Sequence, residues 1–393
     1  MRRLENVLES RHFRTPPSGR RRVVKIALLT MNAEPGGVVS VVWQLARGLA
    51  ARGHSVTVVS DGGTELEKLK AWSIPHVRVP FYQGWKGLLS QRRGMREFFR
   101  SVESDVVHSH SRWPSMVALL SGRRPDVSTL HLDRLTSHGS IFDRGFVRRA
   151  LSVWGRAVTT LDESTRQKLI GEFGLGGDRV HVVPNGIDPS HYDVPSAPER
   201  AEARRRLNLA DRDRVAVFVG RMVDWKQPDA AVRALAHART SGAADAKLIL
   251  CGDGPFLPEV RTLAARLGIE GDCRFLGWTD PREAYRAADF LILPSRSEGF
   301  GLVCVEGMLC GLPVLRTRCG GCDLQVIEGE TGWGVDVGDD AALFERFLAA
   351  VRDPERTHRS GTAARAHALA RFTEEKFLDA MSRVYASLPE VRG

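Results

Sequence analysis

Long hydrophobic runs are missing from this sequence of 393 residues, and no stretch approaches the ~18–20 consecutive apolar residues of a membrane-spanning helix. Residues 1–22 are rich in arginine but contain no apolar core, so they do not look like a secretory signal. Hydrophobic residues make up 42% of the chain and charged residues 26%, which is typical of soluble globular proteins. These features predict a cytoplasmic protein whose contact with membranes, if any, is peripheral.

Cysteine is also scarce, and the six that are present are too few for a disulfide framework in a chain of this size. Cys251, Cys304 and Cys310 lie in apolar runs, as small core residues do. Cys319 and Cys322 have the spacing of a metal or redox pair, but no second Cys/His pair with matching spacing completes a zinc site. The two glycines between them favour a loop at an active site instead.

Acidic residues are outnumbered, and the formal net charge is +10. Such a charge fits nucleic acid, an anionic membrane surface or an anionic substrate. The basic residues are scattered, however, and no DNA- or RNA-reading motif accompanies them. We therefore expect no nucleic-acid partner, and a nonenzymatic nucleic-acid-binding module remains the alternative of a different class.

The chain has no internal repeat; instead, short apolar runs alternate with longer helical stretches, which predicts an α/β fold with parallel sheets. Its length favours two domains. The predicted strands of the first series are Val23–Thr30, Ser55–Ser60, His76–Phe81, Val106–His110, Val127–Leu132, Ala157–Leu161 and Val180–Val183. Those of the second series are Val215–Val219, Lys247–Cys251, Cys273–Leu276, Phe290–Leu293 and Pro313–Thr317.

A segment rich in proline and then in charge, residues 189–206, separates the two series and predicts a linker. We expect a basic disordered tail at 1–22, an N-terminal Rossmann-like domain at 23–190 and a linker at 191–206. A C-terminal Rossmann-like domain follows at 207–373. Ligands of such sheets bind outside the carboxyl ends of the strands.

The most informative segment is 291–307, which begins as an apolar strand, passes through a loop with two glycines and opens into a helix. Glycines let backbone N–H groups approach a ligand, and a helix start favours negative charge. Carboxylates beside a phosphate have hydroxyl groups as their natural partners, and Glu298 and Glu306 flank this helix start. A nucleotide diphosphate sugar requires such a site, with one place for the diphosphate and two carboxylates that accept hydrogen bonds from hydroxyl groups.

The spacing of Glu298 and Glu306 resembles the paired-glutamate signature of family 4 retaining glycosyltransferases, and the similarity continues through residues 310–314 and 329–332. The resemblance covers the chain from Val23 onward. It implies the GT-B fold, in which two Rossmann-like domains face each other across a cleft, and a hexosyltransferase-type enzyme. The N-terminal domain would bind the acceptor, the C-terminal domain the nucleotide sugar, and residues 374–393 would cross back to the N-terminal domain as a helix.

The resemblance also assigns roles to residues of the second half. Glu298 would contact the donor sugar and Glu306 the ribose, while the amides at Phe300, Gly301 and Leu302 would meet the diphosphate. Arg221 and Lys226 follow the first strand of the second series, where a planar fork and a point charge can converge on one diphosphate. In the family the matching pair stabilises the leaving diphosphate. Gly252 lies in a turn that would shape the nucleotide pocket, and the 275–277 turn would pass the base.

In the first half, Gly37 belongs to a glycine pair between a strand and a helix, where the family meets the donor phosphate and the acceptor. His131 ends a strand and matches a histidine that faces the donor sugar, whereas His108 and His110 are weaker candidates and read as structural. The turn at 184–188 also reads as structural. Glu34 and Asp133 lie in candidate acceptor loops, where their carboxylates would pair with amino groups of an acceptor.

Two departures from the family pattern bear on the chemistry. The acidic residue often found after the second glycine pair is replaced by Cys322, which leaves acceptor contacts open. The D-x-D of Asp211 and Asp213 lies in the charged linker rather than at a strand end, whereas a metal-bridged diphosphate needs carboxylates in the cleft. We therefore expect no metal and no cofactor besides the nucleotide sugar itself.

The expected reaction transfers a sugar to an acceptor hydroxyl and leaves an α-linkage. A double displacement would need a carboxylate at the far face of the sugar, and none is evident, so departure and attack on the same face are favoured. A phosphorylase on the same scaffold is an alternative, although no lysine for pyridoxal phosphate is evident. For the acceptor, an aminoglycoside-antibiotic pathway is favoured over cell-envelope or exopolysaccharide assembly.

Overall fold

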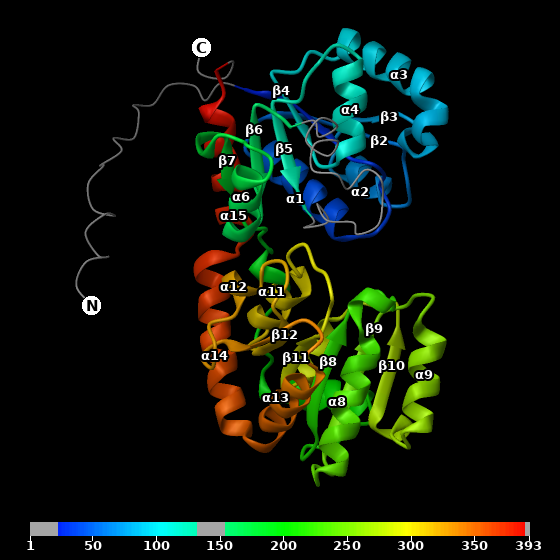
Figure 1. Cartoon of the computed structure of the whole chain (residues 1–393), viewed down its shortest axis with the longest axis vertical. Coiled ribbons are helices and arrows are strands. Elements are labelled where there is room, and N and C mark those ends of the chain that lie inside the picture. The colour runs from blue at the N-terminus through cyan, green and yellow to red at the C-terminus, as the bar shows by residue number, and fades with distance from the viewer. Residues whose placement is uncertain (1–22, 132–153, 390–393) are drawn as a thin grey trace, which may run out of the picture.

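The computed structural model describes residues 23–131 and 154–389, which form two α/β lobes, one above the other in Figure 1. Each lobe is built on one fully parallel sheet. The fold class expected from the sequence, α/β with two Rossmann-like domains, is what the structure has. Among the helices of the described ranges, none has the length and apolar character needed to cross a bilayer.

The N-terminal sheet has seven strands in the order β3-β2-β1-β4-β5-β6-β7. The strands are β1 (Lys25–Leu29), β2 (Ser55–Ser60), β3 (His76–Arg78), β4 (Val106–Ser109), β5 (Val127–Leu130), β6 (Ala157–Thr160) and β7 (Val180–Val182). The helices around them are α1 (Gly37–Ala51), α2 (Leu66–Ala71), α3 (Leu88–Ser101), α4 (Arg112–Leu120) and α6 (Glu163–Gly171), with 3-10 turns η1 (Phe81–Gly87) and η3 (Gly177–Arg179).

Strand β1 shows why this sheet is buried on both faces. Its side chains alternate between the two faces, as the pleat of a strand requires. Ile26 and Leu28 join the core under α1, whereas Ala27 and Leu29 join the core under α3 and α4. A strand buried on both faces reads as a continuous apolar run, and such runs made these strands recognisable in the sequence.

The C-terminal sheet has six strands in the order β10-β9-β8-β11-β12-β13. The strands are β8 (Arg214–Val219), β9 (Ala246–Cys251), β10 (Cys273–Gly277), β11 (Phe290–Leu293), β12 (Val314–Thr317) and β13 (Gly332–Val335). Around them lie α8 (Pro228–Thr240), α9 (Leu257–Arg266), α10 (Arg282–Ala287), α11 (Leu302–Leu309), α12 (Cys322–Gln325), α13 (Asp340–Arg352) and α14 (Pro354–Arg371). The 3-10 turns are η4 (Pro189–His191), η5 (Asp224–Lys226) and η6 (Glu270–Asp272).

Strand β13 was not predicted, because its sequence Gly-Trp-Gly-Val reads as a loop. The glycine has a packing reason: a Cβ at Gly332 would lie 2.1 Å from the carbonyl oxygen of Val314 on β12. Only glycine allows this approach between the two strands, so the residue that suggested a loop is the one that lets the strand form.

The chain passes between the lobes twice, and the two crossings lie side by side. The N–H of Ile187 donates to the carbonyl of Phe372 at 2.8 Å, and the N–H of Glu374 donates to the carbonyl of Ile187 at 2.9 Å. A Cβ at Gly186 would lie 2.3 Å from the carbonyl oxygen of Thr373, so glycine is required there. The turn at 184–188 therefore has the structural role that its sequence suggested.

After the second crossing, helix α15 (Glu374–Ser387) packs along the N-terminal lobe beside α1 (Figure 1). Its apolar side chains, among them Leu378 and Met381, belong to the same core as Ile26 and Leu28. A Cβ at Gly48 would lie 2.3 Å from a methyl group of Leu378, so glycine in α1 admits this close packing. The C-terminal helix thus completes the hydrophobic core of the first lobe.

Part of the expected linker is a helix rather than an extended segment. Helix α7 (Ala197–Arg206) begins at a capping box, in which Ser196 and Glu199 bond to each other's backbone or side chain. The capping motif and Pro198 at the start of the helix are visible in the sequence, but a segment rich in proline and charge also predicts a linker. The helix packs against α10 and belongs to the C-terminal lobe.

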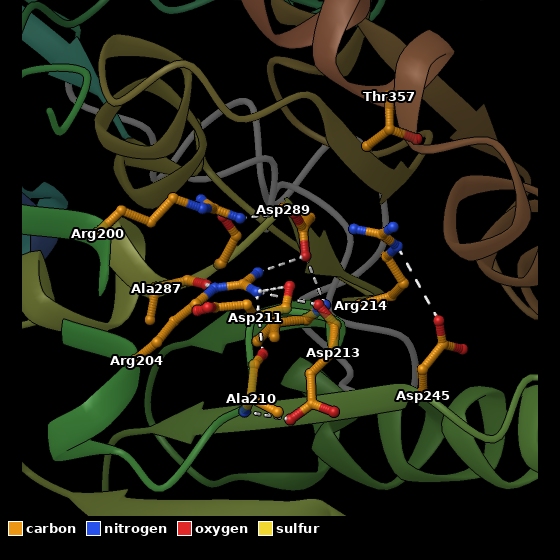
Figure 2. A network of polar contacts seen from close by, with 12 residues as sticks. Arg200, Arg204, Ala210, Asp211, Asp213, Arg214, Asp245, Ala287, Asp289 and Thr357 are labelled. Carbon is orange, nitrogen blue, oxygen red and sulfur yellow. Dashed lines mark hydrogen bonds and ion pairs between the residues drawn. The ribbon is translucent and has the colours of Figure 1, made fainter. Parts of the chain in front are cut away.

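Arg204 anchors α7 through a buried polar network (Figure 2). Its guanidinium pairs with Asp289 at 3.0 Å and donates to the carbonyls of Ala287, Asp211 and Asp213. The carboxylate of Asp213 in turn accepts from the N–H of Ala210 at 2.8 Å. The D-x-D therefore closes a turn at the amino end of β8. It lies at the opposite edge of the sheet from the carboxyl ends of the strands, where ligands of such sheets bind.

We expect Arg204→Met to lower the free energy of unfolding by about 3–5 kcal/mol, because Asp289 loses one of its two paired cations and several buried carbonyls lose their donor. Urea denaturation measures the change. The exposed Arg205→Met on the same helix is the matched control and should change stability by less than about 1 kcal/mol. Equal losses in both variants would contradict the role given to the buried network.

Candidate active site between the two sheets

The carboxyl ends of the two sheets face each other, and an open cavity of about 420 Å³ lies between them. Pro35, which follows β1, lines it from the N-terminal lobe. From the other lobe it is lined by Arg221, Asp253 and Gly254, and Trp278, which follow β8, β9 and β10. The cavity thus occupies the place where ligands of doubly wound sheets bind.

Two helix N-termini meet beside this cavity. An ideal Cβ on Gly37, the first residue of α1, would lie 3.9 Å from the Leu302 side chain at the start of α11. Gly301 precedes α11 with a φ of +75°, a left-handed conformation that favours glycine. The first N–H groups of a helix have no acceptor within the helix, so this junction concentrates backbone donors suited to an anion.

Lys226 and Glu298 form an ion pair at the mouth of α11. Glu298 is only 6% exposed, and its carboxylate also accepts from the Ser295 hydroxyl at 2.7 Å. The loops that carry the pair are joined by their backbones, since the N–H of Arg296 donates to the carbonyl of Trp225 at 2.7 Å. Two residues 72 positions apart in the sequence are therefore held as one unit.

Arg221 is exposed and directed at the cavity, and the loops around it are packed backbone to backbone. A Cβ on Gly252 would lie 1.9 Å from the carbonyl oxygen of Gly220, and one on Gly254 would lie 2.4 Å from that of Met222. Gly252 also donates its N–H to the Gly277 carbonyl at 2.7 Å. Gly252 thus supports the loop that carries Arg221, and its proposed contact with the donor would come through that loop.

Glu306 lies one turn into α11, and the Tyr285 hydroxyl donates to its carboxylate at 2.7 Å. Burial raises the pKa of Glu306 above its ordinary value, and hydrogen bonds from Tyr285 and Tyr192 offset only part of this rise. The two tyrosine rings pack edge to face with centroids 6.3 Å apart. The carboxylate is therefore held in a fixed orientation by aromatic hydroxyls from α10 and from the connection between the lobes.

The loop before α11 is supported from behind by the second glycine pair. A Cβ on Gly320 would lie 2.0 Å from the carbonyl oxygen of Glu298, and one on Gly321 would lie 2.8 Å from that of Phe300. The Phe300 ring is buried against Phe372. Phe300 therefore shapes the loop by packing, and only its backbone is available to a ligand.

The histidines at the ends of β4 and β5 form one buried cluster. His110 and His131 share a hydrogen bond of 2.9 Å, and His108 bonds to Tyr385 of α15 at 2.8 Å and to Thr129 at 2.7 Å. Burial lowers the pKa of His131 to about 4 and that of His108 to about 3, and it also holds the pKa of His110 well below its ordinary value. All three imidazoles are therefore neutral near pH 7.

The remaining candidates are placed as follows. Glu34 is exposed beside Pro35 and accepts from the Thr64 hydroxyl at 2.9 Å. Asp133, the other predicted acceptor contact, lies outside the described residues. The thiol of Cys319 lies 3.4 Å from the Ser295 carbonyl, and Cys322 is buried in the core beside α11. Both cysteines thus have packing roles within the loop that the sequence indicated.

Several residues of the site had no signal in the sequence. Tyr285 reaches Glu306 because α10 packs near α11, and Arg316 and Gln325 reach the loop at Phe300 from β12 and α12. Trp278 is 65% exposed at the cavity, although its segment was expected only to pass a base. Ser295 alone was accessible to sequence reasoning, because it precedes Glu298 by three residues in the same loop.

Comparisons with known proteins agree with this geometry. The family model described as Glycosyltransferase Family 4 matches residues 35–191, and the model described as Glycosyl transferases group 1 matches residues 199–367. A D-inositol 3-phosphate glycosyltransferase of Acidothermus cellulolyticus is 31% identical, over 93% of this chain and 90% of its own. One of Streptomyces scabiei is 29% identical, over 88% of each chain.

Among solved structures, Anabaena Alr3699/HepE in complex with UDP-glucose superposes with a TM-score of 0.81 at 24% identity, over 93% of this chain and 100% of that one. This likeness concerns the fold and confirms the predicted GT-B architecture. The predicted enzyme class is confirmed by the family models and by the curated relatives. The chain belongs to the family of GT-B glycosyltransferases defined by these two domain models, and it is a glycosyltransferase.

Proposed function

We propose that this enzyme is a retaining hexosyltransferase, which moves a sugar from a nucleotide diphosphate sugar to an acceptor hydroxyl and leaves an α-linkage. The observation that carries the proposal is the Lys226–Glu298 pair at the mouth of α11. It brings a cation for the diphosphate and a carboxylate for a sugar hydroxyl to the same helix start. The UDP-glucose bound by the Anabaena neighbour is a donor of this class.

The leaving diphosphate would bind at the junction of α1 and α11, with the amides near Gly301 and Leu302 as donors. Arg221 and Lys226 would offset the charge that develops on it as the bond to the sugar breaks. Glu306, oriented by Tyr285, would accept from the ribose hydroxyls. These cations would supply the role that a divalent metal has in other transferases, so we expect activity in EDTA.

Departure and attack on the same face of the sugar fit the surroundings of the donor. Glu298 is bonded to Lys226 and Ser295, which suits it to bind a hydroxyl rather than to attack carbon. His131 is a neutral imidazole, which would form a hydrogen bond with a hydroxyl group of the sugar. The leaving phosphate would then take the proton of the acceptor hydroxyl, and the configuration at carbon would be retained.

For the acceptor we propose a small cyclitol, with an amino-bearing one of the aminoglycoside type as the favoured case. The Glu34 carboxylate is exposed next to Pro35, which lines the cavity, and is placed to pair with an ammonium group. The named substrate of the Acidothermus relative, D-inositol 3-phosphate, is also a cyclitol. A phosphorylated cyclitol is the competing case. Glu34 argues against it, because its carboxylate would repel the phosphate.

A second candidate acceptor is a lipid-linked glycan of the cell envelope. Helix α3 carries Arg92, Arg93, Arg96 and Arg100 around an open hollow of about 590 Å³, together with an exposed leucine, Leu89. Such a basic helix with an apolar residue fits an anionic membrane surface. This observation favours a peripheral enzyme acting at a membrane.

The donor assignment predicts that Arg221→Ala and Lys226→Ala each lower kcat by about 10²–10³-fold, because the developing phosphate charge loses a partner. Calorimetry with UDP-, GDP-, ADP- and dTDP-glucose in EDTA identifies the nucleotide, and Glu306→Gln should weaken its binding. The exposed Lys70→Ala is the control. Near-normal turnover in both Arg221→Ala and Lys226→Ala would contradict the donor assignment.

The histidine cluster predicts how stability depends on pH. Since the pKa of His131 falls from 6.5 to about 4 on folding, the unfolded chain binds protons in this window that the folded chain does not. The free energy of unfolding should therefore drop as pH falls from about 6.5 toward 4, by about 1.4 kcal/mol per pH unit for each such histidine. Urea denaturation at several pH values measures this slope.

The variant His131→Asn should reduce that slope by the share of one histidine, because His108 and His110 still contribute, and the exposed His358→Gln should leave it unchanged. The same variant should lower kcat without altering the shape of the pH–rate profile above about pH 5, because a neutral His131 does not titrate there. A limb of the profile that disappears with His131 would contradict a neutral role.

The acceptor assignment predicts that Glu34→Gln raises the KM for an aminocyclitol roughly two- to fivefold and leaves that for an uncharged cyclitol unchanged. Glu67→Gln is the exposed control. If the membrane candidate is correct, Arg93, Arg96 and Arg100 changed together to Gln should abolish co-sedimentation with anionic vesicles, and Glu34→Gln should have no effect on KM.

A further inference from the structure

Two arginines are buried in the described part of the chain, and they differ in their partners. Arg204 is paired with the carboxylate of Asp289. Arg316 on β12 is 0% exposed, and within residues 23–131 and 154–389 no carboxylate lies at ion-pair distance from it. A buried charge without a counter-charge is costly, so the position of Arg316 calls for an explanation.

The contacts of Arg316 are to neutral acceptors. One terminal nitrogen donates to the Phe300 carbonyl at 3.2 Å and to the Gln325 amide oxygen, and the other donates to the carbonyls of Cys319 and Gly320 at 2.7 Å each. The Nε atom is buried without a partner. These bonds satisfy most of the donors of the guanidinium, but none of the acceptors is a carboxylate.

Two side chains near Arg316, Glu298 and Cys304, could in principle carry a counter-charge for it. Glu298 is close enough to act on Arg316 electrostatically, but its carboxylate is bonded to Lys226 and Ser295. The Cys304 thiol lies 3.9 Å from the guanidinium, yet burial raises the pKa of Cys304 to about 12, so it carries no charge near pH 7. Among the described residues, therefore, no carboxylate is bonded to the Arg316 guanidinium.

The guanidinium lies directly behind the start of α11. An ideal Cβ on Gly301 would be 3.2 Å from its Nη1 atom. The Phe300 carbonyl accepts from both Arg316 and Gln325, at 3.2 and 2.8 Å. Because the carbonyl and the N–H of one peptide unit point in opposite directions, these two donors aim the Gly301 N–H away from Arg316 and strengthen it as a donor.

We propose that Arg316 is a buried counter-charge for the diphosphate of the donor, acting from behind the loop at Phe300 and Gly301. It is a positioning residue, because it reaches the phosphate only through that loop. The inference rests on the donor site proposed above. Lys226 is already paired with Glu298, whereas Arg316 has no carboxylate at ion-pair distance among the described residues, and a diphosphate in front of the loop would supply that anion.

The arrangement has a consequence for catalysis. A cation held in place by four hydrogen bonds to oxygen and shielded from water does not reorient as charge builds on the leaving phosphate, and its field is weakly screened. Arg221 is exposed and Lys226 partly so, and both are therefore screened more strongly. Arg316 supplies the part of the positive field that salt affects least.

The first test compares Arg316→Gln and Arg316→Lys with the wild type and with Arg204→Met. Calorimetry measures the Kd of the preferred nucleoside diphosphate and of the matching nucleoside, which has no phosphate. Arg316→Gln should weaken the diphosphate by about 10- to 100-fold and leave the nucleoside unchanged, and Arg316→Lys should recover most of the loss. Arg204→Met should lower stability without altering either Kd. Equal weakening of both ligands by Arg316→Gln would overturn the proposal.

A second variant introduces a carboxylate beside Arg316 from the chain itself. It tests the proposal even if Arg316→Gln does not fold. Cys304→Asp places a carboxylate beside Arg316, so it should leave the unfolding temperature at or above that of Cys304→Ser while weakening the diphosphate. A large loss of stability in Cys304→Asp alone would show that Arg316 has no unmet charge and would overturn the inference.

If the wild type binds no nucleoside diphosphate, the proposed donor site fails. If Lys226→Ala weakens binding but the Arg316 variants do not, only this inference fails.

Discussion

The site depends on the pairing of the two chain crossings, in which Ile187 exchanges backbone hydrogen bonds with Phe372 and Glu374. Arg47 of α1 reinforces it by pairing with Glu374 at 2.8 Å and with Asp188 at 3.6 Å. The crossings set how the lobes face each other, and α15 then joins the N-terminal core. Only with this arrangement does the start of α1 meet the start of α11, so the donor site is a product of domain placement.

The charges of the site are arranged in layers around that junction. Exposed Arg221 lines the cavity, the Lys226–Glu298 pair lies at the helix mouth, and Arg316 is enclosed behind the loop. In the N-terminal lobe, burial keeps the histidine cluster uncharged, whereas the Glu34 carboxylate is exposed beside Pro35. Cations on the donor side together with a neutral imidazole suit the binding of a diphosphate next to a sugar whose hydroxyl groups need hydrogen bonds rather than ions.

Much of the fold was predictable because its strands are buried on both faces and read as separate apolar runs; β2 and β11 have the predicted limits. The failures have physical causes. Strand β13 begins with a glycine, Gly332, that its neighbour β12 requires, and α7 is rich in charges that serve a buried network as well as solvent. In both cases a residue chosen for a tertiary contact imitated the composition of a loop.

The sequence by itself determined the α/β class, the two-domain organisation and the motif that carries Glu298 and Glu306, because these follow from periodicity and from spacing within one segment. Only the tertiary structure decided that Lys226 pairs with Glu298, that Tyr285 orients Glu306 and that three histidines form one cluster. It also decided that Arg316 lies behind the loop at Phe300 with no carboxylate of the described residues at ion-pair distance. Such contacts join residues from different strands and helices, and their burial and pairing depend on how those elements pack, which local sequence does not encode.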